Sequence, residues 1–102
     1  YWKSMIAVSN PAIQEKLLSD LRSTRKEVVI EAFRSTLKFD PLTPLKRYSG
    51  RMLSVITDLN DTPISLHNLL PDLPHVRISG TGHWLQLDRP EEFNRILDAF
   101  LR

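Results

Sequence analysis

Apolar residues recur at helical spacing in the first forty residues of the chain. The stretch from 11 to 22 follows an Asn-Pro pair, a good combination of cap and first turn, and its apolar residues fall on one face. The stretch from 25 to 38 follows Thr24, which has the spacing of a capping box with Glu27, and it carries a broad apolar face. The pattern therefore predicts helices over residues 11–22 and 25–38.

The pattern changes from helical to strand-like in the middle of the chain. Two prolines and a glycine interrupt residues 39–51, where we expect an extended connector. The run at 51–57 is almost continuously apolar, as in a strand covered on both faces, and turn formers fill 58–63. Residues 64–70 have room for about two helical turns. Apolar and polar residues then alternate over 75–79, which predicts a second strand.

The last predicted helix begins at Pro90. Proline is favoured in a first turn, and the two glutamates that follow it complement the positive end of the helix dipole. The predicted order is helix, helix, strand, helix, strand, helix, which is an α/β arrangement. Because two strands joined by a helical crossover lie parallel, we expect their carboxyl ends at one edge of the sheet.

Polar side chains follow both predicted strands. Asp58, Asn60 and Asp61 follow the first strand, and His83 follows the second in a Gly-Thr-Gly-His turn. Ligands bind at this edge of open α/β sheets, and a carboxylate beside a histidine is the orienting half of a nucleophile-activating triad. Two interpretations of His83 stay open, because Gly-x-Gly after a strand is also ordinary turn chemistry. His83 is either a general base or a polar residue in a tight turn.

Composition and charge narrow the choice of partners. With 102 residues, 41% hydrophobic and 25% charged, the chain resembles one ordinary soluble globular unit. The net charge of +2 comes from scattered basic residues, so we expect neither nucleic acid nor an anionic membrane surface as a partner. No run reaches the roughly 18 apolar residues of a membrane span. The chain begins with Tyr1 rather than Met, and we expect a fragment, a processed product or one piece of a longer polypeptide.

The absence of cysteine excludes disulfides, thiolate metal sites and a cysteine nucleophile within the chain. It leaves the compartment open, and we expect a cytoplasmic protein. His67 lies in a helical stretch and His75 opens a strand, so we interpret both as surface or packing residues. No two histidines have the spacing of a metal pair on a helix, and we expect neither a metal nor a cofactor.

The run GTGHWLQLDRPEEFNRILDAFL, residues 80–101, strongly resembles the carboxyl-terminal end of α/β-hydrolase fold proteins. In that family a Gly-x-Gly-His turn precedes a Pro-Glu-Glu helix start and a terminal Phe-Leu. The resemblance extends back through LPDLPHVRIS at 70–79 and GRMLSVITDLNDTP at 50–63. It implies lid-type helices over residues 1–40 and the C-terminal part of an α/β-hydrolase core over residues 41–102.

The resemblance also implies roles for individual residues. His83 matches the general base of the family, and Asp61 matches the acid that orients this base, with Asp58 or Asn60 as alternatives. Asn60 could orient an imidazole but could not offset its positive charge. The implied activity is hydrolysis of a small ester, lactone or amide by a Ser-His-Asp mechanism.

The residues beside the histidine turn allow two interpretations each. Trp84 and Leu85 either line a substrate pocket or pack the last helix against the sheet. Trp2, Met5 and Ile6 form either part of an apolar lid over a cavity or a frayed terminus.

The nucleophile elbow Gly-x-Ser-x-Gly of the family is absent from this chain. The nucleophile, Ser or Asp, would therefore belong to an N-terminal part of the same hydrolase outside these residues. The alternative, from a different functional class, is a non-catalytic module that self-associates with a second copy through exposed sheet edges.

Overall fold

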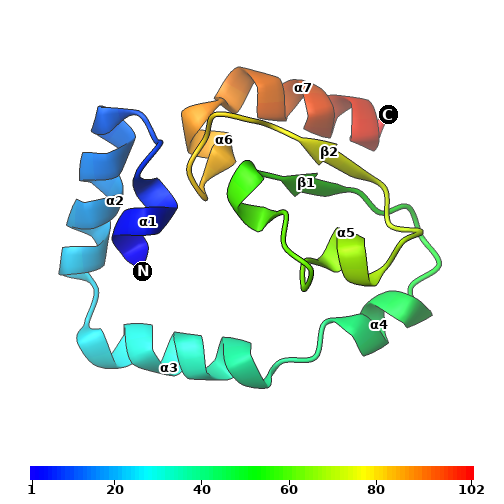
Figure 1. The fold of residues 1–102 in the computed structure, drawn as a ribbon, viewed down its shortest axis with the longest axis horizontal. Coiled ribbons are helices and arrows are strands. Elements are labelled where there is room, and N and C mark those ends of the chain that lie inside the picture. The colour runs from blue at the N-terminus through cyan, green and yellow to red at the C-terminus, as the bar shows by residue number, and fades with distance from the viewer.

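The computed structural model describes residues 1–102, and most of them are helical (Figure 1). Helices cover 59% of the chain, whereas the strands β1 (Ser54–Ile56) and β2 (His75–Arg77) have three residues each. The expected α/β class is therefore wrong, and the chain is not a typical portion of an α/β-hydrolase. The sheet stays small because each strand has only one partner. The apolar residues that flank β1 have no further strand with which to form backbone hydrogen bonds.

The N-terminal part consists of α1 (Trp2–Ile6), α2 (Pro11–Ser23) and α3 (Lys26–Lys38). The helices predicted over 11–22 and 25–38 are confirmed as α2 and α3, with ends that differ by one residue. α2 begins where expected because Asn10 Oδ1 accepts a hydrogen bond from the backbone N–H of Ala12 at 2.9 Å.

The capping box expected before α3 is wrong. α3 begins after Arg25 without a side-chain cap. The hydroxyl of Thr24 instead donates to the backbone oxygen of Asp20 at 2.8 Å. Thr24 therefore completes the last turn of α2 rather than the first turn of α3.

The extended connector expected over residues 39–51 is also wrong, because it contains a short helix, α4 (Leu42–Arg47). The carboxylate of Asp40 accepts hydrogen bonds from the first two backbone N–H groups of this helix, at 2.9 and 3.4 Å. Pro44 is tolerated in the first turn, where its missing N–H is not needed. Breaker residues alone thus predicted a loop, although a capping aspartate precedes them.

The two strands pair in parallel, as predicted, and each residue of β1 faces the residue of the same rank in β2. Their connection contains a 3-10 turn, η1 (Asp58–Asn60), and a one-turn helix, α5 (Leu66–Leu69). The chain ends with α6 (Leu85–Asp88) and α7 (Pro90–Leu101), so the helix predicted from Pro90 is confirmed. Figure 1 shows α7 beside the sheet and α3 on the opposite side of the molecule. None of the helices combines the length and the apolar character needed to cross a membrane.

The core is small and lies around the ends of the strands. Only 11 of the 102 residues are buried, and Ile78 and Thr57, each directly after a strand, are fully enclosed. In contrast, no residue of α3 is buried, and its Leu37 is 86% exposed. Packing therefore concentrates at one end of the sheet, where the N-terminal segment also arrives.

One carboxylate joins this N-terminal segment to the glycine turn. Asp88 Oδ2 accepts hydrogen bonds from the Ser9 hydroxyl at 2.8 Å and from the Gly82 backbone N–H at 2.9 Å. Asp88 Oδ1 accepts a third bond from the Asn10 backbone N–H at 3.1 Å. The carboxylate thus links segments that lie 79 residues apart in the sequence.

The approach of the two segments is too close for a side chain at Gly82. A Cβ atom at this position would lie 2.1 Å from Ser9 Oγ and 2.8 Å from the backbone oxygen of Met5. The same Met5 oxygen accepts a hydrogen bond from the backbone N–H of His83 at 2.8 Å. Gly82 therefore allows the backbone contact that places His83.

Replacing Asp88 with Ala should destabilise the chain by about 2–3 kcal/mol, because three donors lose a charged acceptor and Ser9 is buried. Urea denaturation measures the change. Asp98→Ala is the matched control, since its partner Arg102 is exposed, and it should cost at most about 0.5 kcal/mol. Equal unfolding midpoints for the two variants would contradict the role of Asp88.

Candidate functional site

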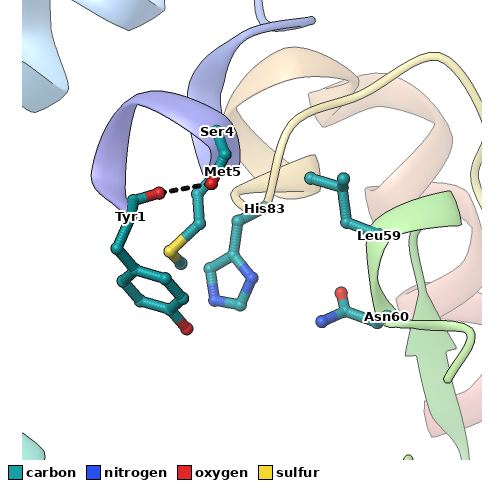
Figure 2. Close-up of a pocket in the computed structure, with 6 residues that line it drawn as sticks. All are labelled: Tyr1, Ser4, Met5, Leu59, Asn60 and His83. Atoms are coloured by element: carbon teal, nitrogen blue, oxygen red, sulfur yellow. Dashed lines mark hydrogen bonds between the residues drawn. The ribbon is translucent and has the colours of Figure 1, made fainter. Parts of the chain in front are cut away.

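A pocket of about 210 Å³ lies where the ends of the two strands meet the N-terminal segment (Figure 2). Its walls come from α1, from η1 and from the glycine turn. The residues that line it are Tyr1, Ser4, Met5, Leu59, Asn60 and His83. Two of the predicted site residues, Asn60 and His83, therefore share one pocket, as expected from parallel strands that end at the same edge.

The backbone of the glycine turn directs His83 into this pocket. Gly80 has φ +72°, a left-handed conformation that a residue without Cβ adopts readily, and it lets the chain turn sharply after β2. The backbone N–H groups of Gly82 and His83 are then fixed by Asp88 and Met5. The imidazole of His83 extends into the pocket from this fixed backbone (Figure 2).

The surroundings of the His83 ring favour its neutral form. The ring packs against the Trp84 ring edge to face, with centroids 4.9 Å apart and planes at 83°. Partial burial lowers the pKa of His83 below its usual value, because the charged imidazolium loses more hydration than the neutral ring. The side chain nevertheless keeps a solvent-exposed part. An accessible and neutral imidazole can accept a proton at neutral pH.

Asn60 faces His83 across the pocket (Figure 2). Its side-chain oxygen accepts a hydrogen bond from the hydroxyl of the fully buried Thr57 at 2.9 Å, which fixes the orientation of the amide. A group that orients a general base must accept the N–H of one ring nitrogen so that the other can take a proton. The Asn60 oxygen is bonded to Thr57, the amide nitrogen points toward the His83 ring (Figure 2), and no hydrogen bond joins the two side chains.

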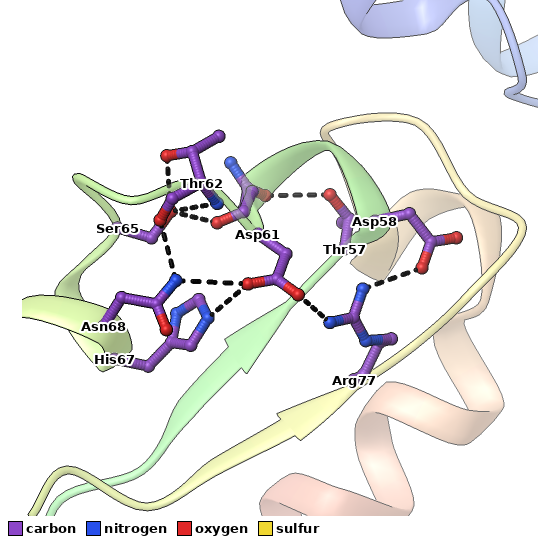
Figure 3. A network of polar contacts seen from close by, with 9 residues as sticks. Thr57, Asp58, Asp61, Thr62, Ser65, His67, Asn68 and Arg77 are labelled. Carbon is purple, nitrogen blue, oxygen red and sulfur yellow. Dashed lines mark hydrogen bonds and ion pairs between the residues drawn. The ribbon is translucent and has the colours of Figure 1, made fainter. Parts of the chain in front are cut away.

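Asp61, the acid that the sequence favours, belongs to a different network (Figure 3). One of its oxygens lies 3.0 Å from His67 Nε2 and accepts from Asn68 Nδ2 at 3.2 Å, while the other pairs with Arg77. The Arg77 guanidinium holds the pKa of Asp61 well below its usual range. No hydrogen bond joins Asp61 to His83.

Asp58, the second candidate acid, also pairs with Arg77, at 3.0 Å. It accepts further hydrogen bonds from the Ser79 hydroxyl at 3.1 Å and the Gly80 backbone N–H at 3.3 Å. These bonds, with Arg77 first, lower the pKa of Asp58. Asp58 therefore secures the chain after β2, and it makes no hydrogen bond with His83. The pairing of His83 with either aspartate stays a prediction.

Sequence reasoning missed Arg77 and Asp88. Arg77 is the last residue of β2, and its guanidinium lies between the two aspartates that follow β1 (Figure 3). The parallel pairing could have indicated this, because a cation at the end of one strand faces the acidic turn after the other. Asp88 gave no such signal for its contacts with Ser9 and Asn10, since these partners lie 79 and 78 residues away.

The other histidines form a pair on the far side of Asp61. His67, interpreted as a surface or packing residue, is buried and contacts Asp61. Its ring lies 4.6 Å from the ring of His75, centroid to centroid. The structure contains no group of three or more His, Asp or Glu side chains arranged to hold a metal ion.

Trp84 and Leu85, the predicted substrate-binding residues, do not line the pocket of His83. Trp84 stacks on Trp2, with centroids 5.0 Å apart and planes at 18°, and both rings line a separate apolar cavity. Leu85 is buried in the core. At the N-terminus, Met5 lines the pocket of His83 and Ile6 is buried, so this segment is packed rather than frayed.

The His83 imidazole should titrate at a lower pH in the folded chain than in the unfolded chain, because burial disfavours its charged form. The folded state then binds fewer protons, so the contribution of His83 to stability falls as the pH falls through about 6.5. Nuclear magnetic resonance of the ring protons, with and without concentrated urea, measures both midpoints. A folded midpoint equal to or above the unfolded one would contradict the burial argument.

Comparison of the chain with known proteins finds no relative. The chain matches no known protein family, no curated protein sequence and no solved structure. The hydrolase resemblance therefore depends on the residues of the glycine turn and the strand ends alone.

Proposed function

We propose that this chain supplies the histidine base of a hydrolase that acts on small esters, lactones or amides. The observation that carries the proposal is the shared pocket of His83 and Asn60, which come from the ends of two parallel strands. His83 has an accessible side chain, and its lowered pKa favours the unprotonated ring that a general base needs at neutral pH.

The chemistry requires one nitrogen of His83 to take the proton of an attacking hydroxyl while the hydroxyl oxygen bonds to the substrate carbonyl carbon. The same nitrogen then gives this proton to the leaving oxygen or nitrogen as the bond to the leaving group breaks. At about 210 Å³ the pocket is smaller than the 300–1,000 Å³ typical of drug-sized ligands. This size favours a small acyl group.

The attacking hydroxyl would come from polypeptide outside these residues. Ser4 is the serine that lines the pocket, but its hydroxyl donates to the Tyr1 backbone oxygen at 2.6 Å. The chain also has no Gly-x-Ser-x-Gly sequence, the turn that exposes an activated serine.

The group that orients His83 is either Asn60 or one of the two aspartates. Asn60 shares the pocket with His83 and could orient it, as in triads that use an amide, but its oxygen would first have to turn from Thr57 toward the ring. Asp61 would add a negative charge beside the imidazolium, but it would have to leave Arg77 first. Asn60 is therefore the preferred orienting group, because it already lines the pocket, and Asp61 is the alternative acid.

A fluorophosphonate probe, which reacts with activated serines, tests the proposal on the full-length product of the gene that encodes this chain. His83→Ala should slow labelling at least about 100-fold, because the serine loses its base. His75→Ala is the matched control, since His75 lies outside the pocket, and it should label at the normal rate. Absence of labelling in the unchanged protein, or equal labelling of the two variants, would overturn the proposal.

A second candidate function, self-association without catalysis, is favoured by the exposed surface of the chain. Each strand has one unpaired edge. The accessible surface of 7716 Å² exceeds, by about 1,800 Å², the roughly 5,900 Å² typical of a compact 11.8 kDa monomer. A standard interface covers about 800 Å² per partner, so this excess is large enough for contact with a second copy.

Light scattering over a range of concentrations tests this second function. Self-association should raise the measured molar mass from 11.8 kDa towards twice that value as the concentration rises. The expected cause is pairing of strand edges together with burial of exposed apolar side chains. A constant monomer mass at all concentrations would contradict it, whereas it would leave the hydrolytic proposal unaffected.

A further inference from the structure

A second cavity, of about 360 Å³, lies between α2, α3 and the two tryptophans. Ten residues line it, and eight of them are hydrophobic. The side chains that carry the argument are Trp2, Val28, Val29, Ala32, Phe33 and Trp84. The cavity shares no lining residue with the pocket of His83.

Aromatic rings form two of the walls of this cavity. Trp2 and Trp84 stack with their planes at 18°, and both line the cavity. Phe33 lies on α3 and is held in place by an edge-to-face contact with Tyr1, with centroids 5.7 Å apart. Rings fixed by other rings form a preformed surface, which lowers the entropic cost of binding.

The polar groups of the cavity are already satisfied. Asp20 pairs with Lys16 at 2.6 Å, and the Thr24 hydroxyl donates to the Asp20 backbone oxygen at 2.8 Å. An anionic ligand would find no cation among the lining residues and would lose its hydration, while the one carboxylate there already pairs with Lys16. The lining therefore favours a neutral ligand.

The apolar side chains of α3 that line the cavity are only partly covered by protein. Val28 is 54% exposed and Phe33 is 40% exposed. Covering such surface stabilises by roughly 25 cal/mol per Å². An apolar molecule in the cavity would cover it.

We propose that this cavity binds a neutral molecule with an apolar chain, such as a medium-length alcohol. The cavity is open to solvent on the side of Val28 and Phe33, and its volume of about 360 Å³ lies within the roughly 300–1,000 Å³ of small-ligand sites. The proposal deepens the proposed function, on which its link to catalysis rests. Trp84 contacts the His83 ring and also lines the cavity, so the bound chain would be the alcohol part of an ester whose small acyl group lies in the pocket of His83.

Fluorescence offers a direct test, because the only two tryptophans of the chain both line this cavity. The probe is 8-bromooctan-1-ol, whose heavy atom quenches a tryptophan that it contacts. Quenching should saturate, and it should occur well below the concentration at which the short 3-bromopropan-1-ol quenches by collision. The anion 8-bromooctanoate should bind at least about tenfold more weakly, because the cavity offers no partner for its charge.

Variants decide whether the quenching reports on the cavity. Ala32→Phe fills it from α3 and should weaken binding at least about tenfold. The matched control is Ala99→Phe, an exposed alanine on α7 outside the cavity, which should leave binding unchanged. Val28→Phe provides a second block, one turn earlier on α3, if circular dichroism shows that Ala32→Phe loses helix.

Unsaturable quenching, or equal affinity of the blocking and control variants, would overturn the inference. Because His83 does not line the cavity, His83→Ala should bind 8-bromooctan-1-ol normally. If the unchanged protein binds 8-bromooctan-1-ol but its serine is not labelled, the proposed function fails and the cavity proposal stands. If the serine is labelled but 8-bromooctan-1-ol does not bind, the cavity proposal fails and the proposed function stands.

Discussion

The carboxylate of Asp88 connects the N-terminal segment to the glycine turn. Both cavities are lined by residues from these two parts of the chain, so both depend on this connection. The carboxylate binds the backbone of Gly82 and the segment at Ser9 and Asn10, and this contact brings Met5 to the backbone of His83. His83 then faces one pocket, and the next residue, Trp84, faces the other. A negative charge that accepts three hydrogen bonds is a strong and directional connection, which a core of 11 buried residues could not supply by apolar contact alone.

Arg77 decides which polar groups remain for His83. Its guanidinium pairs with Asp58 and Asp61 together, and both carboxylates keep their charge because their pKa values are lowered. A carboxylate that turned to His83 would give up a charge-assisted bond, and the neutral form of His83, which partial burial favours, would attract it only weakly. Asn60 has no such competing ion pair. Arg77 therefore keeps both carboxylates in the network after β1, apart from the pocket that His83 and Asn60 share.

Some local signals in the sequence predicted local structure well, although the capping box before α3 and the connector over residues 39–51 were wrong. The Asn-Pro start of α2, the proline start of α7 and the parallel pairing of the strands were all predictable, because each depends on a few neighbouring residues or on a short crossover. The α/β class was wrong because that class requires a larger sheet. This chain has one sheet of two short strands, and most of its residues are helical. The contacts of Asp88 with Ser9 and Asn10 cross most of the chain, so no pattern of spacing indicated them. Arg77 could have been predicted in part. Its position at the end of β2, paired with the last residue of β1, brings it to the acidic turn after β1.

The apolar face of α3 is exposed, and the folded chain gains stability from this face only if another molecule covers it. Val28 and Phe33 contribute to a cavity, while Leu37 continues the same face beyond it. Contacts of this kind lower the free energy of the folded state only when something covers them. A bound apolar molecule would cover the first two and, because it binds the folded chain alone, would stabilise the packing of α3 on α2. Leu37 would stay uncovered, so an apolar ligand and contact with another polypeptide are complementary rather than competing ways to complete this face.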